Sequence, residues 1–90
     1  MAVQQNPDTM AAFQEIMASD LSEVDKVAAG FKLVTDFFLY HGDREIELLR
    51  AMNDRERLVK EQIKVSTIRT MQDIFAQAYR EATGRKGWPQ

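Results

Sequence analysis

Side chains able to carry acid–base, nucleophilic or metal chemistry are few in this sequence and lie far apart. His41 is the only histidine, and cysteine is absent, which removes thiolate nucleophiles, thiolate metal ligands and disulfides. A serine or threonine nucleophile needs a neighbouring base to activate it. The sequence offers no second histidine that could serve as the base of a catalytic triad. Glu45 and Glu47 are two residues apart, a spacing that points carboxylates to different faces of a helix. We therefore predict that the chain is not an enzyme.

Ligand-binding motifs are equally sparse. One histidine with Asp43 and Glu45 nearby makes a poor metal site, so no metal is expected. The four glycines stand apart and form no phosphate-binding loop. We expect no cofactor and no small-molecule substrate. His41 followed by Gly42 is better explained as the end of a helix, where a histidine favours the negative end of the helix dipole.

The charge distribution argues against nucleic acid as a partner. The net charge is −2; residues 1–40 carry two basic and six acidic side chains, and residues 41–90 carry ten and eight. Neither half has the concentrated basic patch of a nucleic-acid binder. A helix-turn-helix around Gly42 would open its second helix with Asp43-Arg44-Glu45, which places acids against phosphates. Arg80, Arg85 and Lys86 keep a small DNA-binding regulator as a third, less favoured function.

Length and composition indicate one small domain in the cytoplasm. Ninety residues bury only a modest core, which makes such a chain marginal unless its helices pack well or chains associate. The longest run of aliphatic or aromatic residues is Phe37 to Tyr40, far shorter than a membrane span. The first eight residues lack the basic and apolar regions of a signal peptide. We expect no membrane association.

The sequence predicts an all-α fold: a helical hairpin or three-helix unit with a long C-terminal helix, packed as a dimeric bundle. Both prolines lie near the ends, and good helix formers dominate between them. We expect a flexible N-terminus over 1–6, a single helical domain over 7–84 and a tail over 85–90. The predicted helices run over residues 7–18, 22–41 and 43–83, with Gly42 as the turn. A kink or break near residue 53, where Asn53-Asp54 can cap a new helix, is the alternative.

Hydrophobic periodicity suggests where partners bind. One face of the second predicted helix holds Val24, Val27, Ala28, Phe31, Val34, Thr35 and Phe38, and its last turns are apolar nearly all round. In the back half of the third helix a second stripe runs from residue 68 to residue 82. A 20-residue helix spans ~30 Å, so it would cover residues 43–62 and leave that stripe bare. A monomeric bundle closed by the first helix is the competing arrangement. The predicted partner-binding residues are Phe37, Tyr40, Ile68, Ile74, Phe75, Tyr79 and Trp88.

These patterns favour a non-enzymatic protein-interaction module. Such a chain would bind and modulate a larger protein as an inhibitor, adaptor or chaperone, through apolar helix faces, and would form a homo-oligomer. The second-ranked function is a structural component that assembles into a multi-chain helical bundle. A short chain without catalytic equipment is also typical of phage-type mobile elements that encode modulators of host proteins.

Overall fold

A computed structural model describes residues 5–85, with side chains from Asp8 onward. Three helices make up this part of the chain: α1 (Gln5–Ala18), α2 (Glu23–Ala51) and α3 (Arg55–Thr83). No strand occurs within the described range, and the all-α prediction is confirmed. The predicted contribution of Trp88 lies outside the described residues.

Local capping explains where α2 begins. Ser22 adopts an extended backbone conformation, and its hydroxyl accepts a hydrogen bond from the Asp25 amide at 3.2 Å. This satisfies one of the amide groups that the first helical turn leaves free. The predicted start of the second helix at Ser22 is thereby confirmed. The first helix begins at Gln5, two residues before its predicted start.

The predicted turn at Gly42 is wrong. Gly42 lies inside α2, which continues for nine further residues and ends at Ala51. The break falls instead at Met52–Asp54, where Asn53 adopts a left-handed conformation with φ 60° and Asp54 caps α3. The alternative break near residue 53 is therefore confirmed, and a single helix over 43–83 is excluded. Packing of α2 along α3, with Gly42 lying against Val65, outweighs the helix-ending tendency of one glycine.

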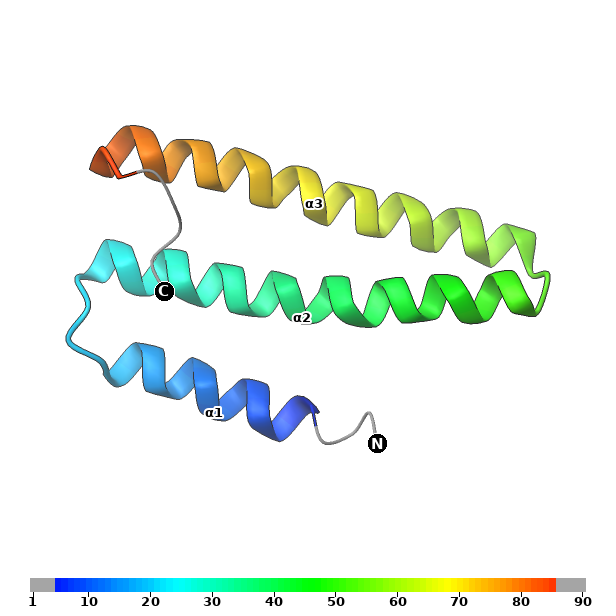
Figure 1. Cartoon of the computed structure of the whole chain (residues 1–90), viewed down its shortest axis with the longest axis horizontal. Helices are drawn as coiled ribbons and strands as arrows, with labels where there is room; N and C mark the ends of the chain where they lie inside the picture. The colour runs from blue at the N-terminus through cyan, green and yellow to red at the C-terminus, as the bar shows by residue number, and fades with distance from the viewer. Residues whose placement is uncertain (1–4, 86–90) are drawn as a thin grey trace.

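The length argument drawn from that turn also fails. Because α2 and α3 each have 29 residues, α2 runs along the whole of α3 rather than half of it. The two helices form an antiparallel hairpin (Figure 1). The contacts between the two helices follow this antiparallel order, with rising residue numbers in α2 matched by falling numbers in α3. Asp25 contacts Tyr79, Thr35 contacts Gln72, and Gly42 lies against Val65. Many of the residues in this contact line are small or polar.

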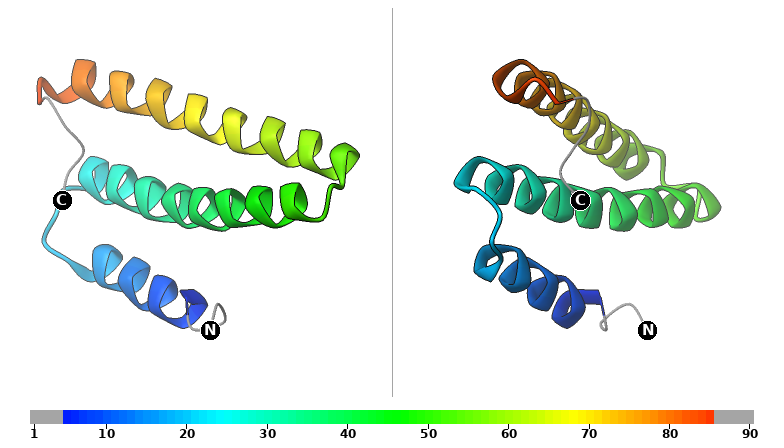
Figure 2. Two further views of the ribbon diagram at one scale, coloured as in Figure 1. Left: turned by 45° about the vertical axis from the view of Figure 1, so that its right-hand side comes forward. Right: turned by 60° about the vertical axis from the view of Figure 1, so that its left-hand side comes forward.

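The first helix packs on the opposite side of α2 from α3. Among the described residues α1 contacts α2 and makes no contact with α3, so the chain does not close into a three-helix bundle. The helices lie side by side in one layer with principal extents of 46 × 29 × 14 Å (Figures 1 and 2). The shortest extent is close to the ~10–12 Å diameter of a single helix. Such a layer has two broad faces that its own helices cannot cover.

The core is correspondingly small. Six apolar residues are buried, and no large side chain within the described range is completely shielded. They are Ala28, Ala29, Leu39, Leu49, Val65 and Tyr79. No helix in residues 5–85 carries an apolar stretch long enough to cross a lipid bilayer.

Candidate interaction surface

The structure separates the predicted partner-binding residues of α3. Ile68, Phe75 and Tyr79 turn toward α2, and the Phe75 ring stacks on Phe31 with centroids 4.6 Å apart. Tyr79 is only 5% exposed. Ile74, by contrast, is 64% exposed on the side of α3 turned away from α2. The predicted single stripe is thus divided between the hairpin interface and the outer edge of the layer.

The two predicted residues of α2 also differ in position. Phe37 is half-buried beside α1, with its ring edge-on to His41 at 4.5 Å. Tyr40 is exposed, accepts a hydrogen bond from Arg44 at 3.2 Å, and lies under the Arg44 guanidinium at 5.5 Å. His41 itself sits inside α2 rather than at its end, so its predicted role at a helix terminus is wrong.

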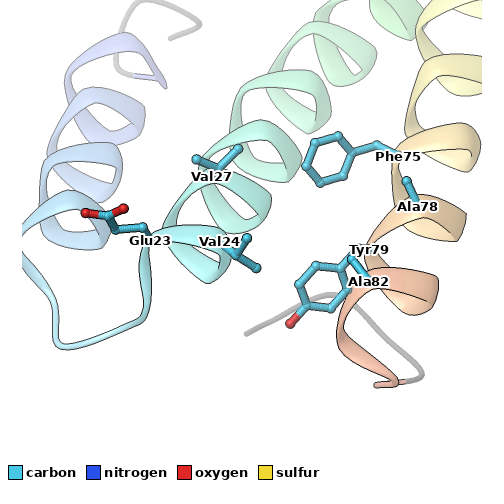
Figure 3. A pocket seen from close by; sticks show the side chains of 7 residues that line it. All are labelled: Glu23, Val24, Val27, Phe75, Ala78, Tyr79 and Ala82. Atoms are coloured by element: carbon cyan, nitrogen blue, oxygen red, sulfur yellow. The ribbon is translucent and has the colours of Figure 1, made fainter.

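Two apolar grooves open on the layer where helices meet. The first lies between the start of α2 and the end of α3 and has a volume of about 290 Å³. Figure 3 shows Phe75 and Tyr79 reaching from α3 toward α2 across this groove. Its lining consists of Glu23, Val24, Val27, Phe75, Ala78, Tyr79 and Ala82. The second, of about 360 Å³, lies between α1 and α2 and is lined by Thr9, Met10, Phe13, Val34, Phe37 and Phe38.

Both grooves open on the same side of the layer. At 100° per residue, Val24, Val27, Val34 and Phe38 fall within an arc of about 80° on α2. The two earlier residues line the first groove and the two later ones line the second. They therefore form an apolar ridge with a groove on each flank. We call this surface the apolar face: Met10, Phe13, Val24, Val27, Val34, Phe38, Phe75, Ala78 and Ala82.

Large side chains on the apolar face remain in water. Val24 is 52% exposed, Val27 60% and Phe38 50%. Contiguous exposed apolar groups of this size mark interaction sites in soluble proteins. The sequence placed Val24, Val27, Val34 and Phe38 on one helix face, but none of the four is among the predicted partner-binding residues. The hydrophobic periodicity of this face is visible in the sequence. The sequence does not show that neither α1 nor α3 covers the ridge.

The opposite side of the hairpin is polar. Lys32 pairs with Asp36 at 2.8 Å, and Gln72 donates to the same carboxylate at 2.8 Å. Further along, Arg69 donates to both carboxylate oxygens of Asp43 at 3.0 Å. On the α2 wheel these groups are centred about 140° from the apolar ridge. These ion pairs and hydrogen bonds therefore lie on the side of α2 opposite the apolar ridge.

A buried polar cluster joins α2 to α3 at the open end of the hairpin. The Tyr79 hydroxyl donates to Asp25 at 2.7 Å, and Arg85 donates to the second carboxylate oxygen at 2.9 Å. The hydrogen bond from Tyr79, reinforced by Arg85, lowers the pKa of Asp25 below its ordinary value. Burial and the same hydrogen bond raise the pKa of Tyr79. No local sequence pattern predicts this cluster, because Tyr79 and Arg85 lie 54 and 60 residues from Asp25 along the chain.

The polar groups at the open end of the hairpin have partners within the chain. Tyr79, Asp25 and Arg85 satisfy one another, so the cluster serves to hold α3 against α2. No group of three histidine, cysteine or acidic side chains in the described part of the chain is arranged to hold a metal ion. The buried Nε2 of His41 has no hydrogen-bond partner among residues 8–85.

Comparisons of the chain with protein families, with curated proteins and with solved structures found no match.

Proposed function

We propose that this chain is a non-enzymatic protein-interaction module that binds and modulates a larger protein as an inhibitor, adaptor or chaperone. The apolar face is the observation that supports the proposal. A ridge flanked by two grooves offers concave apolar sites for the side chains of a partner helix. The groove between α2 and α3 is lined almost entirely by apolar groups and has a volume of about 290 Å³.

Binding would derive its free energy from burying the ridge and the groove walls. Val27 and Phe38, each at least half exposed, have the most area to lose to a partner. The charged groups of the opposite side, such as Asp43 and Arg69, would remain in solvent and influence solubility and encounter rather than affinity. The cysteine-free composition fits a reducing compartment, and we propose the cytoplasm as the location.

Site-specific cross-linking tests this proposal. Because the chain has no cysteine, Val27→Cys introduces a unique attachment point for a photo-activated cross-linker on the apolar face. Asp43→Cys, on the polar side of the same helix and similarly exposed, is the matched control. In an extract of the cells that make the protein, we expect adducts from position 27 and none from position 43. Equal labelling from both positions, or no adduct from either, would contradict the proposal.

A structural role in assembly is the second candidate, and a different surface supports it. The side of α3 turned away from α2 carries Ile63 and Ile74, which are 62% and 64% exposed. We call these two residues the outer edge of α3. A chain with two separate apolar surfaces is able to link more than one neighbour, whereas a closed dimer uses one surface twice. Growth of the particle with concentration, beyond a dimer, is the result that would favour assembly.

A further inference from the structure

We propose that a second copy of this chain covers the apolar face in the free protein, giving a two-layer unit of six helices. This inference rests on the proposed function, because both assign the same face to binding. The larger partner would then compete with the second copy for the ridge of Val24, Val27, Val34 and Phe38. Three observations point to a second copy as the first occupant.

The first observation is the exposed area. The chain exposes 6531 Å², whereas a compact monomer of 10.4 kDa exposes about 5,400 Å². The difference, about 1,100 Å², exceeds the roughly 800 Å² that each partner contributes to a stable interface. An interface of standard size on one broad face would therefore remove most of this excess.

The second observation is the shape of the apolar face. The layer is one helix thick, and a groove lies on each flank of α2, the first beside residues 23–27 and the second beside residues 34–38. Such a surface is complementary to itself when one copy is offset by half the helix spacing. The ridge of each copy then lies in a groove of the other, and a two-fold axis relates the two contacts. Val24, Val27 and Phe38, each at least half exposed, are the ridge side chains available to fill the opposing grooves.

The third observation is charge. Among the residues that line the two grooves, Glu23 is the only charged one, and it lies at the end of the first groove. Figure 3 shows its carboxylate turned away from Tyr79. Contact between the two groove linings therefore buries no charged side chain other than Glu23, and buried unpaired charges would oppose association of identical surfaces. The ion pairs Lys32–Asp36 and Arg69–Asp43 stay on the outside of the two-layer unit.

Sedimentation of the full chain, compared across two matched variants, tests the inference. Val27→Glu places a charge on the ridge, and Ile63→Glu places one on the outer edge of α3 at nearly equal exposure, 60% against 62%. We expect the wild type to sediment at twice the chain mass. Val27→Glu should raise the dimer dissociation constant at least about tenfold, while Ile63→Glu leaves it unchanged. Far-ultraviolet circular dichroism checks that both variants keep their helices.

A measurement on the unaltered chain guards against misfolding of the variants. In a mixture of isotope-labelled and unlabelled copies, filtered nuclear Overhauser contacts between chains should arise from Val24, Val27, Val34 and Phe38. Intermolecular contacts from Ile63 or Ile74 instead would overturn the inference, and so would a monomeric wild type or a particle that keeps growing with concentration.

The two proposals fail separately. A monomeric wild type whose position 27 still cross-links to a different protein overturns the second copy and leaves the interaction function standing. A closed dimer that cross-links only to itself supports the second copy and contradicts the binding of a larger protein.

Discussion

Gly42 of α2 lies directly against the side chain of Val65 on α3. A Cβ atom placed on Gly42 would stand 2.5 Å from Val65 Cγ2, closer than any normal carbon–carbon contact. This glycine therefore serves to let two helices approach closely in the middle of the hairpin. It does not supply the left-handed conformation of a helix end, which Gly84 does at the end of α3 with φ 74°.

Gly42→Ala should destabilise the chain despite alanine's higher helix propensity. Overpacking against Val65 costs about 1–3 kcal/mol, while the propensity gain is about 1 kcal/mol. We expect a net loss of about 1 kcal/mol in the free energy of unfolding by urea. Gly30→Ala is the control, because its neighbours are the Phe13 ring edge and the terminal methyl of Met17 at 3.2 and 3.3 Å, which can shift. A stabilised Gly42→Ala variant would contradict the close-approach explanation.

The same contact predicts a specific rescue. Val65→Ala removes the methyl group that collides with the new Cβ, so the double variant Gly42→Ala with Val65→Ala should lose less stability than the two single losses added together. A double-mutant cycle by urea unfolding gives the coupling. Strict additivity would show that residues 42 and 65 do not interact.

The polar pair Thr35 and Gln72 in the hairpin interface should behave as a coupled unit. Gln72 Nε2 donates to Thr35 Oγ1 at 2.6 Å, and the Thr35 hydroxyl also lies 2.6 Å from the Phe31 carbonyl. Thr35→Val leaves an amide donor short of a partner and should cost about 1–2 kcal/mol. Thr35→Val combined with Gln72→Leu should recover most of that loss, because both partners are then apolar. Unfolding free energies that simply add would contradict the pairing.

Stability should fall at both extremes of pH through the Asp25–Tyr79 pair. The pKa of Asp25 is held below its ordinary 3.8 by the Tyr79 hydrogen bond and Arg85, so its contribution is present above that value and is lost as pH falls through the folded-state pKa. The pKa of Tyr79 is raised above 10.0 by burial and by Asp25, so its contribution is present below 10.0 and is lost as pH rises through the folded-state pKa.

Thermal unfolding followed across pH checks this dependence. Asp25→Asn should lower the melting temperature near neutrality and flatten the loss of stability on the acid side. Tyr79→Phe should flatten the loss on the alkaline side, since it leaves nothing to ionise there. Acid profiles of wild type and Asp25→Asn that run parallel would contradict the assignment.

The exposed pair Asp43 and Arg69 should matter little, although it joins the same two helices. Arg69 Nη2 lies 3.0 Å from both carboxylate oxygens, but the two side chains are 53% and 54% exposed. Water and salt screen such pairs, so Asp43→Asn should change the unfolding free energy by less than about 1 kcal/mol. A larger loss that disappears in high salt would show that the pair is less screened than its exposure implies.

The sequence by itself determined the helical nature of the chain and several of its boundaries. Continuous helix formers between Pro7 and Pro89 exclude strands, because nothing alternates with period two. Ser22 marks the start of α2 and Gly84 the end of α3, since capping depends on a few adjacent backbone groups. The break at Asn53-Asp54 was visible too, as an alternative to the turn at Gly42.

Only the tertiary structure decided which helix faces are covered. From its neighbours in the sequence alone, Gly42 resembles a glycine that ends a helix. Its role in close helix packing is visible only in the contact with Val65, which is 23 residues away in the chain. Gln72 is polar, so hydrophobic periodicity passed over it in α3, although it pairs with Thr35 in the contact between α2 and α3. The placement of α1 on the far side of α2 left Val27 and Phe38 in water. Periodicity reports that a face is apolar, but which face is buried depends on contacts between helices distant in the chain.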